Sequence, residues 1–324
     1  MLLTISETQE LIKQGKALSL AGDEQLLKQL PKGCWIAGTI PYFMSEDGGV
    51  STKDKIFVSE ISEIAKCTQI SWYDESKLAN IPNDAPENGF SIIIIPATSD
   101  VHIAFSKNAS DYENMFMKPL IGWISGVHLD DLGSETPKVM NGELQELSSQ
   151  KAVVMHFEIP SNYMASISIL NLFEQGSGDS ITFETDGFQV NECLINGVKT
   201  NFADYLIKND VNIEYPLVAD YSGTMVNASF QAIQEEGKLV DLYAPVFKGI
   251  TYKLAKPVDN YVEQFKVEMP KNVHPVFSCN CILNYLYSHL EGKKTGAITG
   301  PITFGEIAYQ LLNQTLVYLE LNEV

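Results

Sequence analysis

Four consecutive isoleucines, Ile92–Ile95, constrain the fold of this chain of 324 residues more than any other feature. Successive side chains of a strand point to opposite faces of a sheet, so this run is buried only where both faces are covered. We therefore predict that Ser91–Pro96 is a buried strand. The run is also the longest strongly apolar segment, and it is far shorter than the roughly 20 residues of a membrane-spanning helix.

The pattern of strands changes near residue 150 and predicts a chain of two parts. Residues 129–151 are polar and contain glycine and proline, which favours a long surface connection. Beyond them, Ser166–Ile169 alternates polar and apolar residues, and Asn196-Gly197 is typical of a hairpin turn. At roughly 150 residues per domain, we predict an N-terminal α/β region (1–150) and a C-terminal α+β region (151–324). The expected fold class is α+β, a two-part scaffold of mixed, largely antiparallel sheets flanked by helices.

Two short helices are expected in the first part. Ser6 and Gln9 match the capping-box pattern at the start of a helix, which Gly15 would end. A second helix is predicted over Glu24–Leu30, because Pro31 cannot continue it.

The charged residues exclude two classes of partner. The chain has 41 acidic residues and 22 basic ones, all of them lysine, for a net charge of −19. Nucleic acids and anionic membrane surfaces require a basic footprint, so we expect neither as a partner. Without arginine, no planar guanidinium can hold a phosphate or a carboxylate through two parallel hydrogen bonds.

The N-terminal residues and the cysteines predict the cellular compartment. Met1–Glu7 lacks the basic and apolar regions of a secretory signal peptide. The five cysteines are sparse and odd in number, so we predict reduced thiols in a cytoplasmic protein.

Cys279-Asn280-Cys281, with His274 five residues before Cys279, is the cluster with the most reactive side chains. In a strand the two sulfurs point to opposite faces, and a structural zinc site needs four ligands, so we expect no metal here. The pattern favours a strand-to-helix junction with small buried thiols. A thiol at a helix N-terminus can also be nucleophilic, so a hydrolase or transferase that uses Cys279 stays open as an alternative.

Other catalytic signatures are missing from the sequence. Gly122–Gly126 has its serine at the fourth place instead of the third, so it is not the nucleophile elbow of a hydrolase. No glycine-rich phosphate loop occurs. The five histidines lack ligand spacing, although one imidazole is sufficient to bind haem non-covalently. We predict a protein that is not an enzyme, with no catalytic residues, and the cofactor stays open.

Several short blocks resemble the FIST family in their order along the chain. They are Leu194–Gly197, Asp204–Leu206, Tyr215–Val218, Val246–Leu254, Pro275–Asn280, Phe304–Ile307 and Asn313–Leu316, with Trp35–Thr39 near the N-terminus. The resemblance is clearest over residues 190–321. It matches residues 1–150 to the family's FIST N part and residues 151–324 to its FIST C part. One position departs: the family often has arginine shortly after Ser-Cys, where this chain has Ile282 and Leu283.

The resemblance implies a sensory protein in signal transduction that binds a small molecule such as an amino acid. A haem-binding sensor of nitric oxide is the alternative that it implies. If the missing arginine pairs with an anionic ligand in relatives, the ligand of this chain differs or is absent. Because the chain shows no output module such as a kinase, we expect it to act on a separate signalling protein.

Polar residues beside presumed strand ends form the predicted ligand site. They are Thr39, Tyr221, Cys279, Asn280 and Glu306. Glu306 would accept an amine, while Tyr221 and Asn280 would orient the other end of the ligand. The competing interpretation is that Glu306 caps or pairs within the final turn.

Overall fold

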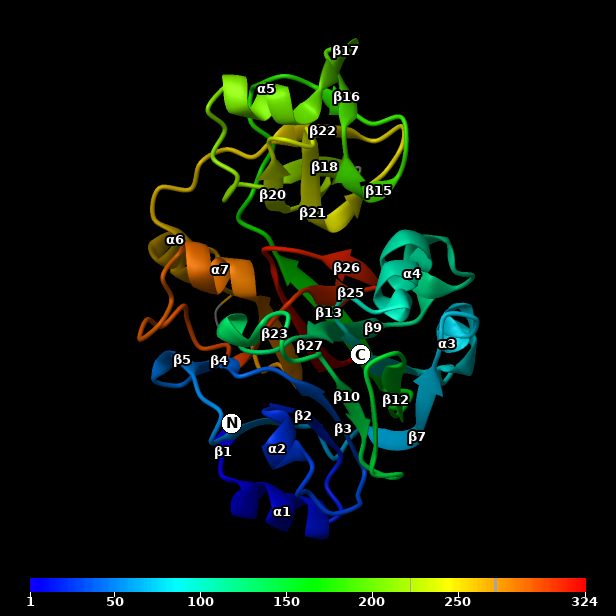
Figure 1. Cartoon of the computed structure of the whole chain (residues 1–324). Coiled ribbons are helices and arrows are strands. Elements are labelled where there is room, and N and C mark those ends of the chain that lie inside the picture. Colours follow the sequence, from blue (N-terminus) through cyan, green and yellow to red (C-terminus); the bar gives the residue numbers. More distant parts are fainter. Residues whose placement is uncertain (222, 271–272) are drawn as a thin grey trace.

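The isoleucine run lies in strand β8 (Gly89–Pro96), and Ile92–Ile95 are fully buried, which confirms the prediction. Ile92 and Ile94 belong to one hydrophobic core and Ile93 and Ile95 to another, so both faces of the sheet are covered. The computed structural model describes residues 1–221, 223–270 and 273–324. Figure 1 shows a large lobe that holds both ends of the chain and, above it, a small lobe of residues 181–254.

Within the described residues, three six-stranded sheets build the large lobe. The first has the order β1 (Leu2–Leu3), β6 (Ile56–Glu60), β2 (Leu18–Gly22), β3 (Trp35–Thr39), β10 (Val139–Asn141) and β11 (Glu146–Ser148). The second runs β26 (Gln310–Leu312), β25 (Glu306–Ala308), β9 (Leu120–Ser125), β8, β12 (Ala152–Glu158) and β7 (Lys66–Tyr73). The third runs β13 (Tyr163–Leu170), β27 (Leu316–Glu323), β23 (Phe277–Cys281), β24 (Gly300–Thr303), β4 (Tyr42–Ser45) and β5 (Gly48–Ser51).

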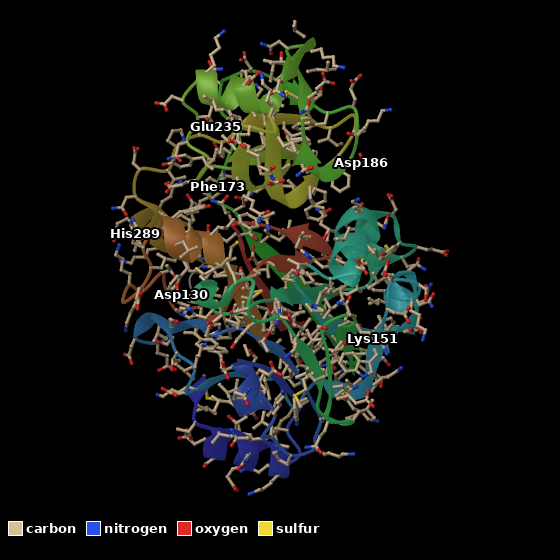
Figure 2. All side chains as sticks on the ribbon, in the orientation of Figure 1. Asp130, Lys151, Phe173, Asp186, Glu235 and His289 are labelled. Carbon is tan, nitrogen blue, oxygen red and sulfur yellow. The ribbon has the colours of Figure 1, made fainter. Side chains whose placement is uncertain are left out.

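Two further sheets form the small lobe around a core of their own. The larger has the order β17 (Val198–Asn201), β16 (Glu192–Ile195), β14 (Ile181–Thr182), β22 (Thr251–Leu254), β18 (Leu217–Tyr221) and β19 (Thr224–Ala228). The smaller has the order β15 (Gly187–Val190), β21 (Leu239–Val246) and β20 (Phe230–Gln234). Phe173, which Figure 2 places between the lobes, packs with Val218 and Ala255 where the chain enters and leaves the small lobe.

Short helices flank the sheets. They are α1 (Ile5–Lys13), α2 (Glu24–Leu27), α3 (Ile81–Asp84), α4 (Asp100–Asn108), α5 (Phe202–Lys208), α6 (Tyr261–Glu268) and α7 (Ile282–Tyr287). Single 3-10 turns are η1 (Leu78–Asn80), η2 (Ala109–Asp111), η3 (Met115–Met117) and η4 (Leu129–Asp131). No helix in the described part of the chain has the length and apolar character needed to traverse a bilayer.

The strand pairs confirm the predicted fold class, α+β with mixed, largely antiparallel sheets. Among the described strands, β2–β3, β8–β9 and β23–β24 pair in parallel, and the other neighbours are antiparallel. The hairpin turn at Asn196-Gly197 joins β16 to β17, and both of its residues have positive φ, as a tight hairpin requires.

The sheets do not divide at residue 150, where the sequence predicts a boundary. β12 lies between β7 and β8, while β24 and β25 pair with β4 and β9. The polar stretch 129–151 contains the hairpin β10–β11, and Asn141 within it is fully buried. The composition of the sequence identifies this polar segment. It does not predict which distant strands pair, because that pairing depends on residues that are neighbours only in space. The division into regions 1–150 and 151–324 stays a prediction.

Two predicted helix ends are corrected. The capping box of α1 is Thr4 with Glu7 and not Ser6 with Gln9, because Thr4 has the extended backbone of an N-cap. Helix α2 ends at Leu27, since the N–H group of Leu30 bonds the carbonyl three residues back, as in a turn.

Candidate functional site

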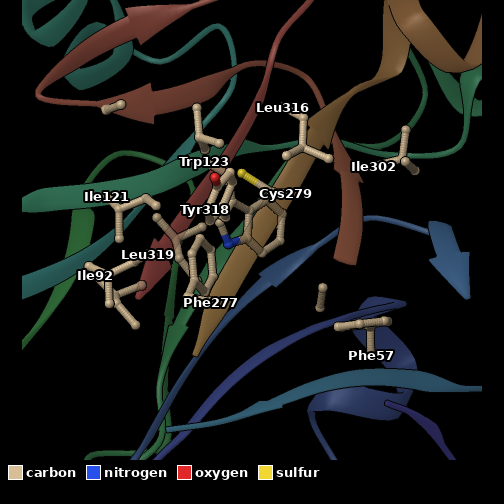
Figure 3. Packing of buried hydrophobic residues seen from close by; sticks show 14 of the residues in the cluster. Phe57, Ile92, Ile121, Trp123, Phe277, Cys279, Ile302, Leu316, Tyr318 and Leu319 are labelled. Atoms are coloured by element: carbon tan, nitrogen blue, oxygen red, sulfur yellow. The ribbon is translucent and has the colours of Figure 1, made fainter. Parts of the chain in front are cut away.

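The segment Cys279-Asn280 lies where β23 meets α7, as the sequence predicts, but inside the core. Both side chains are buried, and the thiol of Cys279 lies 3.3 Å from the carbonyl oxygen of Gly122. Figure 3 shows Cys279 among the apolar side chains of this core, beside Trp123 and Leu316. Burial raises the pKa of the Cys279 thiol well above its ordinary value, so the thiolate needed for catalysis is disfavoured.

Glu306 is fully buried in β25 and bonds groups of the protein itself. Its Oε2 accepts hydrogen bonds from the hydroxyl of Thr315 at 2.8 Å and from the N–H of Thr315 at 3.2 Å. The hydroxyl of Thr303 lies 3.4 Å from its Oε1 and 3.3 Å from the carbonyl oxygen of Asn280. Burial raises the pKa of Glu306 to about 8, although the bonds from Thr315 lower it. This geometry favours the competing interpretation of a carboxyl that pairs within the final turn.

Thr39 and Tyr221 lie away from this cluster. The hydroxyl of Thr39, at the end of β3, accepts a hydrogen bond from the N–H of Lys138 at 2.9 Å. Tyr221 ends β18 in the small lobe and is 38% exposed. The structure therefore brings Cys279, Asn280 and Glu306 together and leaves the other two predicted residues elsewhere.

A chain of hydrogen bonds through His156 is the arrangement in the sheet most similar to a catalytic triad. The hydroxyl of Ser91 lies 2.7 Å from His156 Nδ1, and His156 Nε2 lies 3.0 Å from the hydroxyl of Tyr73. That hydroxyl donates to Asp84 at 2.8 Å. Ser91 on β8 and His156 on β12 are both buried and face no open cavity wall between the lobes, so we assign these hydrogen bonds a structural role.

The cavity best suited to a ligand lies between the lobes. It has a volume of about 400 Å³. The segments that border it are the end of β8 and the start of α4, η4, α7, and β15, β20 and β21 of the small lobe. Most of its wall is apolar, with Ile282, Leu283 and Phe304 on one side. Ile103 and Leu132 also line it and are 39% and 58% exposed.

His102 contributes to this wall and carries a buried nitrogen that lacks a hydrogen-bond partner in the described structure. Its Nδ1 lies 3.3 Å from the N–H of Thr98, which donates to it, and its buried Nε2 has no partner in the described structure. Burial lowers the pKa of the His102 imidazole to about 4, so the ring is neutral at pH 7. A neutral imidazole that accepts at Nδ1 carries its proton on Nε2, which makes Nε2 an unused donor.

Thr98 holds this geometry through an uncommon backbone conformation. Its φ is +62°, in the left-handed region that β-branched residues rarely adopt. Thr98 links β8 to α4, and the next residue, Ser99, caps α4 by accepting from the N–H of His102 at 3.2 Å. Strained residues often occur at functional sites, and this one lies in the cavity wall.

Clusters suited to a metal are missing from the residues that the structure describes, where no three His, Cys, Asp or Glu side chains converge. The hydroxyls of Thr303 and Thr315 surround Glu306, the carboxyl near the Cys279 segment.

A comparison with protein-family models decides the relationship of the chain. The model described as "Family of unknown function (DUF6976)" matches residues 3–322. The chain belongs to this family. No curated protein matches this DUF6976 member.

The sequence reasoning missed the cavity, including His102 and Thr98, because its wall comes from segments far apart in the chain. The sequence feature of this DUF6976 chain that comes closest to indicating the cavity is the apolar pair Ile282-Leu283, shortly after Ser278-Cys279. Both residues of the pair line the cavity. Its polar neighbours carry no pattern that a sequence motif describes.

Proposed function

We propose that this DUF6976 protein binds a small, largely apolar molecule in the cavity between its lobes and acts as a non-enzymatic sensor. The observation that carries the proposal is the cavity itself. Its volume of about 400 Å³ lies within the range of small-molecule sites. Exposed apolar side chains gather in its wall, including Ile103 and Leu132, and such patches are typical of binding sites.

The position of the cavity supports a sensory role. Its wall combines α4 and α7 of the large lobe with β21 of the small lobe, so a bound ligand contacts both lobes. Occupancy can then shift the balance between arrangements of the lobes that differ in ligand affinity. We propose that a separate signalling protein reads this change.

The five free cysteines support the cytoplasm as the compartment in this proposal, because thiols persist in a reducing environment. The resemblance to FIST domains is part of the same proposal. The family whose model matches the chain is described as one of unknown function, so its description does not bear on the proposal.

The wall does not favour the amino acid that the FIST resemblance implied. An amino acid carries a carboxylate, and none of the described residues that line the cavity is a lysine. Ile282 and Leu283, at the position where FIST relatives often have arginine, supply apolar surface there. We therefore propose a neutral ligand.

We do not extend the proposal to haem or to cysteine catalysis. An imidazole binds iron through an unprotonated nitrogen, and the Nε2 of His102 carries the proton because Thr98 donates to Nδ1. The thiol of Cys279 is buried and its pKa is raised, so it is neither accessible nor ionised.

A thermal-shift screen of neutral apolar compounds, amino acids and hemin tests the proposed function. We expect neutral compounds to raise the melting temperature of the full chain by several degrees, because a ligand at 100 times its Kd adds about 2.7 kcal/mol of stability. We expect no shift with amino acids and no Soret band with hemin.

Two matched variants locate the binding. Ile103→Trp puts a larger side chain in the cavity wall and should reduce the shift. Ile207→Trp makes the same change on α5, at a residue 48% exposed and outside the cavity, and should leave the shift unchanged. Equal shifts in both variants would show that this cavity is not the site, and a shift with amino acids alone would contradict the proposed neutral ligand.

A further inference from the structure

We infer that a second copy of this chain pairs with strand β13 along its free edge, so that the third sheets of the two copies join across a two-fold axis. β13 ends this sheet in the large lobe (Figure 1), and β27 is its one strand neighbour among the described residues. The edge is separate from the ligand cavity, because no residue of β13 lines that cavity.

A row of backbone groups on β13 has no partner strand. The N–H of Val324 bonds the carbonyl of Asn162, so the even-numbered residues of β13 bond β27. The N–H and C=O groups between them point away from β27, and they belong to Ala165, Ile167 and Ile169. Within the described residues, no other backbone group bonds these three.

The free edge is accessible over residues 165–169. Ile169 is 37% exposed. Ala165 and Ile167 are half-buried, although their side chains pack against the core. Only the start of the strand is closed, because the N–H of Tyr163 bonds the carbonyl of Pro160. A partner strand can therefore reach the three residues whose backbone groups point outward.

The other sheet edges of the described structure are short or interrupted. Edge strand β7 also has eight residues, but it begins with Lys66 and its register with β12 shifts next to Cys67. The remaining edge strands have five residues or fewer. In contrast, β13 pairs with β27 over all eight residues without a shift and contains no acidic or basic residue. Proteins usually charge, shorten or interrupt an edge that must stay unpaired, so this edge indicates pairing.

A second copy fits this edge because the edge is complementary to itself. With a two-fold axis at Ile167, an antiparallel pair places Ala165 opposite Ile169 of the second copy. The outward N–H and C=O groups of both copies then bond each other. The same register places Met164, which is 52% exposed, opposite Leu170 of the second copy and adds an apolar contact.

Charge also favours this edge as the place where two copies meet. The net charge of −19 makes most of the surface repel a second copy, whereas β13 brings no charged side chain to the contact. One pair of strands is a small interface, so we expect the dimer to dissociate on dilution.

Sedimentation velocity of the full chain without ligand tests the inference. Between about 1 and about 500 µM protein, we expect the mass to rise from the 35.9 kDa of one chain toward twice that value. Hydrogen exchange then locates the contact. The amides of Ala165, Ile167 and Ile169 should exchange about tenfold more slowly at the higher concentration, because they are bonded in the dimer.

Two variants of Ile167 separate the backbone from the side chain. Ile167→Pro removes the N–H that faces the second copy and none of the bonds to β27, and edge strands tolerate proline at such positions. Ile167→Ala is the matched control, since it shortens the side chain and keeps the N–H. We expect Ile167→Pro to be monomeric at every concentration and Ile167→Ala to form the dimer.

A wild type with the mass of one chain at every concentration overturns the inference, even if the edge binds an extended segment of another protein. A dimer that persists in Ile167→Pro, or whose slowed amides lie outside β13, also overturns it. If Ile167→Pro does not fold, Ser168→Glu takes its place. This variant puts a carboxylate on the face of β13 away from the core, diagonally across the axis from its counterpart. Loss of the dimer in Ser168→Glu supports the inference, and an unchanged dimer overturns it.

Discussion

Glu306 makes the stability of the protein depend on pH through a single buried carboxyl. Its pKa is raised to about 8 by burial, whereas the ordinary value of a glutamate is 4.5. Between these values the folded protein binds more protons than the unfolded chain. The free energy of unfolding therefore falls as the pH rises through this window, and this contribution is fully present only below pH 4.5.

Glu306→Gln should remove this dependence. The amide oxygen can still accept from Thr315, while the group can no longer ionise. We expect the stability of the variant relative to the wild type to increase between pH 5 and pH 8, by on the order of 3 kcal/mol. Urea denaturation at the two pH values measures the difference.

An exposed carboxylate provides the control for this prediction. Glu235, labelled in Figure 2, lies in the turn between β20 and β21. Glu235→Gln should keep the pH dependence of the wild type. A difference between Glu306→Gln and the wild type that is the same at pH 5 and pH 8 would contradict the assignment.

At the scale of elements, α1 provides a comparison of two neighbouring hydroxyls. The hydroxyl of Thr4 accepts from the N–H of Glu7 at 3.3 Å, and the carboxylate of Glu7 accepts from the N–H of Thr4 at 2.8 Å. Thr4→Ala should lower the free energy of unfolding by about 1 kcal/mol, because it leaves a helix N–H without its cap. Urea denaturation of the whole chain measures it.

Ser6→Ala is the matched control, since Ser6 is exposed within the helix and takes no part in the cap. We expect its effect to be close to zero. A loss with Ser6→Ala as large as that with Thr4→Ala would place the cap where the sequence pattern first indicated it.

Strands with a strong local pattern were predictable, and strands defined by close contact were not. β8 was predicted because four isoleucines permit burial on both faces. Its parallel neighbour β9 was missed, since Gly122 interrupts the apolar pattern. A Cβ at Gly122 would lie 1.8 Å from the carbonyl oxygen of Ile93, so glycine is required there by the approach of the neighbouring strand.

At the scale of the whole molecule, the pairing of distant segments limited the prediction. Fold class follows from local patterns, but the placement of β25 beside β9 depends on contacts that the sequence does not encode locally. The same holds for the candidate site. Cys279 and Glu306 were selected as polar residues near strand ends and do lie together, yet they are buried because the second and third sheets pack against each other.

The contact between the lobes includes polar side chains beside the apolar packing of Phe173, Val218 and Ala255. Asn227 donates to the carbonyl of Asn313, and Ser229 donates to the side chain of Gln314, at 3.0 and 2.7 Å. These bonds join the small lobe to the large lobe next to β26 and β27. A ligand in the cavity would add a further contact between the lobes, and the proposed sensing role rests on that contact.

Mapping a bound probe by NMR tests the ligand cavity most directly. Acetophenone is titrated into the full chain, labelled with ¹⁵N and deuterium, and the shifts of assigned backbone amides are followed. We expect saturable shifts concentrated at the cavity wall, at Thr98, Tyr243 and Leu283, that are reduced in Ile103→Trp and kept in Ile207→Trp. Saturable shifts centred on another surface, or no saturable shift at all, would contradict the assignment of this cavity as the ligand site.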